Sequence, residues 1–181
     1  ATACRESYEC GFPETGEQWM DLKLSISISS VKGGEKMFDK ILYPTDFSRN
    51  AEKCLAFVQR LREAGTREVV LLHVLDRRSF DLLSALDSET TAHAAEENMV
   101  KSSLEKLNET AQELKNSGLA VKIRVEKGVP FSEILKIAEE EDVSAIIVGS
   151  HGTSNLTEVL LGSVSEKVIR KSKRTVLVVK R

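Results

Sequence analysis

Three glycines towards the carboxyl end of the chain have a spacing that suits phosphate binding. Gly149 and Gly152 directly follow the apolar residues 145–148, and Gly162 precedes a segment in which a helix is expected to begin. Glycine lets the backbone approach an anion closely, and a helix start supplies free N–H groups and the positive end of the helix dipole. The spacing is not that of a Walker motif, because no lysine follows the last glycine. The segment therefore predicts a backbone cradle for phosphate, and a tight strand-to-loop turn is the structural alternative for its first two glycines.

Two residues near these glycines also have a structural and a functional interpretation. Ser163 begins the sequence Ser-Val-Ser-Glu, which fits a capping box and would satisfy one backbone N–H while leaving others for an anion. His151 lies between the loop glycines, where it could contact a phosphate.

A second candidate segment, Pro44-Thr45-Asp46, follows another short apolar strand. In open parallel sheets, ligands bind outside the carboxyl ends of the strands, at the point where the strand order reverses. If the strands before Asp46 and before Gly149 are neighbours at that point, both segments face one crevice. The Asp46 carboxylate could then accept hydrogen bonds from ribose hydroxyls, and a turn or helix cap is its structural alternative. Val74, at the end of a longer apolar strand, could contact an adenine edge through its backbone and the ring through its side chain.

No pattern in the sequence indicates a catalytic centre or a protein-bound metal ion. The three histidines, His73, His93 and His151, have no metal-ligand spacing, and His73 is expected to be a hydrogen-bonded core residue. The chain contains no Gly-x-Ser-x-Gly, Cys-x-x-Cys or His-Glu-x-x-His motif. The acidic run at 139–142 is interpreted as a solvated helix end.

Composition excludes several classes of protein. The chain has 181 residues, 41% of them hydrophobic and 30% charged, as in an ordinary soluble globular domain. Its net charge of −2 argues against a basic nucleic-acid-binding surface, no apolar run reaches the roughly 18 residues of a membrane span, and no secretory signal is visible. Of the three cysteines, Cys4, Cys10 and Cys54, the last falls on an apolar helical stripe and is expected in the core. A cytoplasmic protein without a disulfide framework, and without nucleic-acid or membrane partners, is expected.

From Met37 onwards, apolar strands alternate with amphipathic helices. Strands are expected at 40–44, 68–75, 120–126, 145–148 and 175–179, and helices at 48–64, 89–117, 130–142 and 163–172. The helix at 89–117 has a predicted buried stripe formed by Leu104, Leu107, Ala111 and Leu114. The alternation predicts an α/β fold in which a parallel sheet lies between helices on both faces.

Residues 1–36 differ in character from the rest of the chain. They hold two of the three cysteines and the only tryptophan. Codons for Gly33-Gly34-Glu35 can resemble a ribosome-binding site just ahead of Met37. We therefore expect a domain at 37–181, preceded at 1–36 by a translated leader or disordered extension. The alternative is a structured extension that adds an edge strand at 22–30.

Five motifs in a fixed order carry a resemblance to a known family. They are Ile41-Leu-Tyr-Pro-Thr-Asp46-Phe-Ser, Val70-Leu-Leu-His-Val74, Gly128-Val-Pro130, Val148-Gly-Ser-His-Gly152 and Leu161-Gly-Ser-Val164. Together they resemble the ATP-binding branch of the universal stress protein family over residues 37–181. The resemblance implies a three-layer, Rossmann-like fold of the adenine nucleotide alpha hydrolase type, with a five-stranded parallel sheet in the order 3-2-1-4-5.

The resemblance also implies a nucleotide site in the crevice described above. It places ATP there, with Mg or Mn bound through the phosphates. The ribose would be approached by Asp46 and Gly149. The adenine would be framed by Pro44, Val74 and Val148, and Thr45 directly follows Pro44 in the loop after the first strand. The phosphates would be held by Gly152, Gly162, Ser163 and Val164, with His151 beside them.

The resemblance also implies homodimers that pair through the last strand. An apolar edge strand without internal charge, such as the one expected at 175–179, is prone to pair with a second copy; an edge covered by the N-terminal extension is the alternative. The primary prediction is an ATP-binding regulatory protein that acts on an unidentified protein partner and is not an efficient enzyme. Two alternatives remain open: a slow ATPase or autophosphorylating protein, and a nucleotide-free dimerisation module.

Overall fold

The structure, a computed structural model, describes residues 38–78, 89–150 and 161–180 of the chain. Contacts divide the chain between Lys32 and Gly33, and every described residue belongs to the second unit, Gly33–Arg181. The expectations about residues 1–36, and those about His151 and Gly152, therefore lie outside the described residues.

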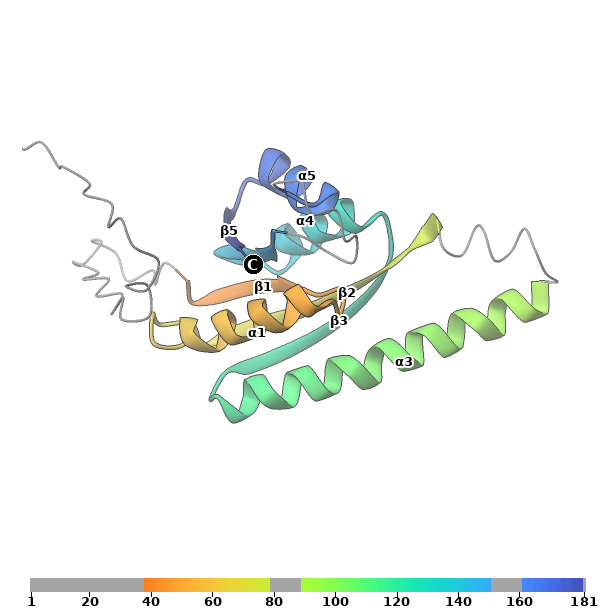
Figure 1. The fold of residues 1–181 in the computed structure, drawn as a ribbon, viewed down its shortest axis with the longest axis horizontal. Coiled ribbons are helices and arrows are strands. Elements are labelled where there is room, and N and C mark those ends of the chain that lie inside the picture. Colours follow the sequence, from red (N-terminus) through yellow and green to blue (C-terminus); the bar gives the residue numbers. More distant parts are fainter. Residues whose placement is uncertain (1–37, 79–88, 151–160, 181) are drawn as a thin grey trace, which may run out of the picture. The chain divides into compact units, whose positions relative to one another are not determined.

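The described residues form a parallel sheet of five strands in the order β3-β2-β1-β4-β5 (Figure 1). The strands are β1 (Lys40–Pro44), β2 (Glu68–Asp76), β3 (Ala120–Gly128), β4 (Ala145–Gly149) and β5 (Thr175–Val179). This order confirms the predicted one. The strands that precede the two candidate segments, β1 and β4, are direct neighbours, with Ile41 opposite Ala145. The carboxyl ends of both strands therefore meet at the same edge of the sheet.

Helices cover both faces of this sheet. They are α1 (Arg49–Leu61), α3 (Glu89–Asn116), α4 (Pro130–Glu140) and α5 (Ser163–Lys171). In Figure 1, α1 and α3 lie on one side of the sheet and α4 and α5 on the other. Successive strand side chains point to opposite faces, so Ile41 and Tyr43 pack in the core beneath α1 and α3, whereas Leu42 packs beneath α4 and α5. The prediction of a three-layer α/β fold is confirmed.

Three strands, β2, β3 and β4, run further than predicted, and the four described helices end one to three residues earlier. The ladder between β2 and β3 continues until Asp76 lies opposite Gly128. Backbone pairing thus extends the two strands beyond their apolar runs. Helix α1 ends at Leu61, and the turn that follows includes Gly65, whose φ of +104° suits the predicted glycine end of this helix. Helix α4 ends at Glu140.

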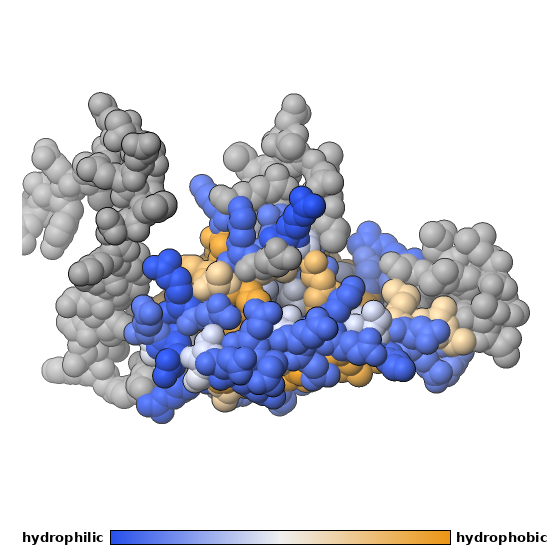
Figure 2. All heavy atoms as spheres, turned by 60° about the horizontal axis from the view of Figure 1, so that its bottom comes forward, coloured by the Kyte–Doolittle hydropathy of each residue, from blue (hydrophilic) through white to orange (hydrophobic). Residues whose placement is uncertain are grey.

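The long helix α3 buries a stripe that differs from the prediction at its first position. Leu107, Ala111 and Leu114 are buried as predicted, but Leu104 is 39% exposed, and Ser103 is buried instead. Ser103 lies four residues before Leu107 and Leu104 three residues before it, so helical periodicity allows either on the stripe, and the packing of α3 buries Ser103. The face formed by α1 and α3 is mostly hydrophilic, with apolar side chains in small separate areas (Figure 2). None of the described helices is long and apolar enough to cross a membrane.

A buried glutamate joins the end of α4 to the sheet, contrary to the prediction of a fully solvated acidic helix end. The side chain of Glu141 is only 6% exposed. Its carboxylate accepts hydrogen bonds from Lys122 Nζ at 2.9 Å, Lys40 Nζ at 3.0 Å and Arg124 Nη1 at 2.8 Å. The bond from Lys122, together with those from Lys40 and Arg124, lowers the pKa of Glu141 to about 2 against the opposing effect of burial. Its neighbours in the acidic run are exposed as predicted.

Candidate functional site

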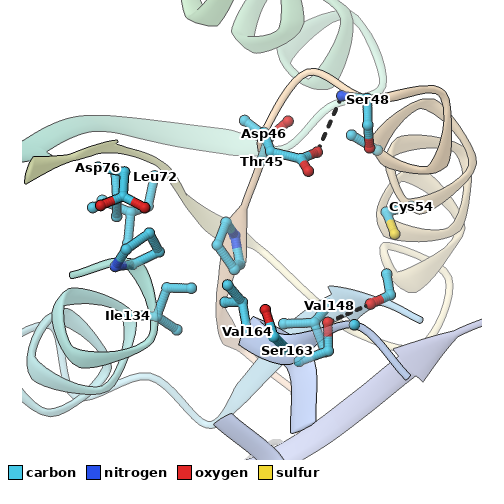
Figure 3. Close-up of a pocket in the computed structure, with 17 residues that line it drawn as sticks. Thr45, Asp46, Ser48, Cys54, Leu72, Asp76, Ile134, Val148, Ser163 and Val164 are labelled. Carbon is cyan, nitrogen blue, oxygen red and sulfur yellow. Dashed lines mark hydrogen bonds between the residues drawn. The ribbon is translucent and has the colours of Figure 1, made fainter. Parts of the chain in front are cut away.

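A cleft lies where β1, β2 and β4 end, bordered by the first turns of α1, α4 and α5 (Figure 3). Its volume of about 390 Å³ lies within the usual range of small-molecule sites. The cleft is lined by Pro44, Thr45, Asp46, Ser48, Ala51, Cys54, Leu72, Val74, Asp76, Pro130, Ile134, Val148, Gly149, Gly162, Ser163, Val164 and Ser165.

Nine of the predicted binding residues line this one cleft. They are Pro44, Thr45, Asp46, Val74, Val148, Gly149, Gly162, Ser163 and Val164. These residues come from the ends of three neighbouring strands and from the start of α5, which the strand order brings together. Their contact with a ligand stays a prediction.

The loop after β1 is held in place by hydrogen bonds. Thr45 N donates to Leu72 O at 2.8 Å, and Phe47 N donates to Thr45 Oγ1 at 3.2 Å. Asp46 Oδ1 accepts from Ser48 N at 3.0 Å, which is the pattern of an Asx turn. The turn considered as the structural alternative for Asp46 is therefore present. The exposed carboxylate also borders the cleft (Figure 3), so both roles are compatible.

The same loop is braced by His73, a residue of β2. His73 Nδ1 lies 2.8 Å from Thr45 O, and its ring centroid lies 4.5 Å from that of Phe47. Lys106 of α3 places its Nζ 5.3 Å from the centroid of the Phe47 ring. Burial lowers the pKa of His73, although the hydrogen bond to Thr45 opposes this. A neutral ring that donates from Nδ1 fits this geometry. The predicted hydrogen bond is confirmed, but His73 is half-buried and does not lie fully in the core.

The prediction of a capping box at Ser163 is wrong. The N-cap residue of α5 is Gly162, and no side chain caps this helix. Glu166 N donates to Gly162 O at 2.9 Å, which is the first hydrogen bond of the helix. The backbone N–H groups of residues 163–165 consequently have no acceptor within α5, which the structure describes in full. They point from the positive end of the helix dipole, where an anion is stabilised.

Two hydrogen bonds attach the start of α5 to the end of β4. Gly162 N donates to Ser150 O at 2.7 Å, and Ser165 Oγ donates to Gly149 O at 2.7 Å. Ser165 is buried, so water competes little for its hydroxyl. These bonds hold the helix start against the strand whose end forms the other side of the cleft. The sequence analysis assigned no role to Ser165. The feature that could have indicated one is a hydroxyl residue in the first turn of a helix after a glycine-rich loop, because such a hydroxyl can bond to nearby backbone groups.

The apolar wall of the cleft belongs to the core beneath α4 and α5. Leu72, Ile134 and Val148 are buried there, and Val74 and Val164 pack against them while remaining partly accessible. A flat apolar ligand would therefore meet aliphatic side chains from two strands and two helices.

Eight lining residues were missed by sequence reasoning. They are Ser48, Ala51, Cys54, Leu72, Asp76, Pro130, Ile134 and Ser165. Leu72 and Asp76 could have been found, because a period of two places them on the same face of β2 as Val74. The residues of α1 and α4 carry no comparable signal, since their place in the cleft depends on how those helices pack.

The cleft has no reactive thiol, although Cys54 lines it. This residue is 1% exposed, as predicted for a core cysteine, and burial raises the pKa of its thiol to about 11. A neutral thiol is a weak nucleophile and a weak metal ligand. Within residues 38–78, 89–150 and 161–180, no three or more His, Cys, Asp or Glu side chains come together to hold a metal ion.

Comparison with known proteins places the chain among close relatives. The model of the universal stress protein family matches residues 37–180. Universal stress protein MJ0577 from Methanocaldococcus jannaschii is 45% identical in an alignment of 156 residues that covers 80% of this chain and 96% of that protein. The solved structure of MJ0577 has a TM-score of 0.73 at 44% identity, covering 80% of this chain and 97% of that one.

Other solved structures share the fold. The protein PH0823 is 36% identical and has a TM-score of 0.67, covering 80% of this chain and 96% of that one. The universal stress protein from Archaeoglobus fulgidus in complex with dAMP has a TM-score of 0.54 over 78% of this chain and 98% of that one. At 21% identity, this second likeness shows the fold alone.

Proposed function

The chain belongs to the universal stress protein family, and we propose that it is a regulatory protein that binds ATP in the cleft at the ends of β1, β2 and β4. One observation carries the proposal: a single cleft combines the N terminus of α5, an apolar wall and the Asp46 carboxylate. A nucleotide needs these three surfaces, because its phosphates accept hydrogen bonds, its base is flat and largely apolar, and its ribose hydroxyls donate.

The phosphates would bind at the start of α5. The N–H groups of residues 163–165 are free of intrahelical acceptors, and Gly162 presents no side chain to an approaching anion. The hydrogen bond from Ser165 Oγ to Gly149 O keeps this helix start beside β4. A divalent cation, Mg or Mn, would be held through phosphate oxygens and would supply positive charge that the described part of the cleft lacks.

The nucleoside would occupy the rest of the cleft. Pro44, Val74 and Val148 would pack against adenine, and the backbone of Val74 would read its edge. Asp46 and Gly149 would approach the ribose. The fold is compatible with this arrangement, since the A. fulgidus protein of the same fold was solved with an adenine nucleotide, dAMP.

Isothermal titration calorimetry tests this proposal directly. We expect the full chain to bind ATP with divalent cation, and to bind adenosine more weakly because adenosine lacks the phosphates. Mass spectrometry of small molecules released on denaturation would reveal a nucleotide carried through purification. A protein that is folded by circular dichroism yet gives no heat with ATP, and releases no nucleotide, would disprove the proposal. The same nucleotide-free result would favour a dimerisation module.

The cleft also favours a second candidate function, slow ATP hydrolysis or autophosphorylation. Ser163 is exposed and lines the cleft at the proposed phosphate position, so its hydroxyl could accept a phosphoryl group. Radiolabelled γ-phosphate transferred to the wild-type chain, but not to Ser163→Ala, would support autophosphorylation. Steady phosphate release above that of a matched blank would support hydrolysis. Tight binding without either signal leaves the regulatory role.

We further propose that two copies pair through β5. This strand lies at the edge of the sheet, beyond β4, and the residues of Thr175–Val179 carry no charge. Ser150 N donates to Val179 O at 2.9 Å, so the peptide groups of Val179 face β4. Because peptide groups alternate sides along a strand, those of Val176 and Val178 face outward, where a second β5 could bond to them. Light scattering after size-exclusion chromatography would measure the mass of the assembly.

A further inference from the structure

One carboxylate in the cleft has no part in the nucleotide contacts proposed so far. Asp76 ends β2 and lies on the same face of this strand as Leu72 and Val74, because side chains two residues apart share a face. Asp76 is one of the residues that line the cleft, and Figure 3 shows it apart from Asp46. Its side chain is 32% exposed. A partly buried charge therefore stands at the rim of the apolar wall, where the edge of a bound base would lie.

The Asp76 carboxylate is held in a defined orientation by Arg78. Its Oδ1 accepts hydrogen bonds from Arg78 N at 3.0 Å and Arg78 Nε at 3.3 Å, and its Oδ2 pairs with a guanidinium nitrogen at 3.2 Å. A carboxylate has about four acceptor positions. These three contacts orient the carboxylate and leave an acceptor position for a further donor.

The distribution of donors and acceptors in the cleft matches that of an adenine nucleotide. N–H donors gather at the start of α5, and phosphates accept. Carboxylates stand at two separate places, Asp46 after β1 and Asp76 at the end of β2. ATP presents donors at two separate places, the ribose hydroxyls and the amino group on carbon 6 of adenine. With Asp46 beside the ribose, the second carboxylate lies at the end of the cleft that the base occupies, on the same strand as Val74.

We propose that Asp76 accepts a hydrogen bond from the 6-amino group of adenine and thereby selects adenine nucleotides. This inference rests on the proposed ATP site. A carboxylate cannot donate to the carbonyl oxygen that guanine and hypoxanthine carry at carbon 6. A base with a carbonyl there would leave two acceptors facing each other, and a base with hydrogen there would lose the bond.

The test removes the 6-amino group from the ligand and the Asp76 carboxylate from the protein, separately and together. Calorimetry on the full chain would compare ATP with purine riboside triphosphate, which keeps the ring nitrogens of adenine but carries hydrogen at carbon 6. We expect the wild-type chain to bind the analogue about tenfold more weakly than ATP, as for loss of one hydrogen bond to a charged group. The Asp76→Ala variant should prefer ATP less strongly than the wild-type chain does, because only the Val74 backbone would then contact the amino group.

Two control variants separate recognition from support of the fold. Arg78→Ala removes the ion pair but keeps the carboxylate, so it should still prefer ATP over the analogue. Asp46→Asn should weaken both ligands by the same factor, because both carry the ribose. Melting temperatures would show that each variant is folded.

The outcomes distinguish the inference from the ATP proposal itself. An analogue-to-ATP ratio that is the same in wild type and Asp76→Ala would overturn the inference while leaving ATP binding intact. Loss of the preference in Arg78→Ala as well as in Asp76→Ala would assign the effect to the Asp76–Arg78 pair as a structural unit, and would also overturn it. A wild-type chain that binds neither triphosphate would disprove the ATP site, and the inference with it.

Discussion

Changing Gly162 to aspartate or asparagine isolates the charge at the start of α5. Gly162 has φ −69° and ψ 150°, a conformation open to any residue, so neither substitution strains the backbone. Aspartate and asparagine are comparably good N-cap residues, and both are at least as favourable as glycine. We therefore expect both variants to keep the stability of the wild-type chain. They have nearly the same shape and differ in one negative charge.

The size of the expected effect follows from the position of Gly162 in the cleft. It lies directly before the N–H groups of residues 163–165, which would hold the phosphates. Two like charges about 4 Å apart repel by about 1 kcal/mol in water and by about 4 kcal/mol at an effective dielectric constant near 20. The cleft lies between these limits, and ATP carries several charges. ATP should therefore bind the aspartate variant at least about tenfold more weakly than the asparagine variant.

Calorimetry with ATP and with adenosine measures this difference. Adenosine carries no phosphate, so its affinity should be the same for both variants. The difference for ATP should shrink as salt is added, because exposed charges are screened. Equal ATP affinities of the two variants at low salt would refute phosphate binding at α5. A loss of adenosine binding in the aspartate variant would instead show that the cleft is distorted.

Three further predictions concern stability, assembly and the core thiol. Glu141→Gln should lower the free energy of unfolding by about 3 kcal/mol, because a pKa of about 2 against an ordinary 4.5 corresponds to that amount at neutral pH; the exposed Glu140→Gln is the control in chemical denaturation. Since folding lowers the pKa of Glu141, its stabilisation is complete above about pH 4.5 and is lost as the pH falls towards 2. When stability is measured against pH, Glu141→Gln should not show this loss at acid pH. Stability curves that fall in parallel for the wild-type chain and the variant would contradict the assignment of the loss to Glu141. Val176→Pro should abolish the dimer without unfolding the chain, because proline is tolerated where a strand N–H faces outward, whereas Leu177→Pro should break the ladder to β4 and unfold it. An unchanged mass for Val176→Pro by light scattering would argue against pairing through β5. Cys54 should react with a thiol reagent only under denaturing conditions, since it is 1% exposed and burial raises its pKa to about 11; because Cys4 and Cys10 are also present, the labelled residue is identified by peptide mapping, and rapid labelling of Cys54 in the native chain would contradict its burial.

The sequence predicted the strands and the helical layers well because their signals are local. The short, β-branched apolar run at 175–179 predicts a strand, and the structure places β5 over those residues. The glycines around 149 and 162 likewise marked a strand end and a helix start. The alternation of these elements then restricted the fold to a parallel sheet with crossover helices.

Which residue caps α5 and which residue of α3 faces the core depend on contacts between elements that are distant in sequence, and no local pattern contains those contacts. Gly162 rather than Ser163 is the N-cap because Gly162 and Ser165 bond to the end of β4. Ser103 rather than Leu104 faces the core because the rotation of a helix is set by what it packs against.

The order of the elements and the segments that could meet a nucleotide follow from the sequence alone, because apolar periodicity and glycine positions act over a few residues. The electrostatics depend on how the chain folds. Glu141 is buried because cations more than fifteen residues away in sequence, on β1 and β3, converge on it. Asp76 joins the cleft because β2 lies beside β1 and α4 packs over its end. The environment of a charge is the sum of everything around it in space, and that sum exists only once the chain has folded.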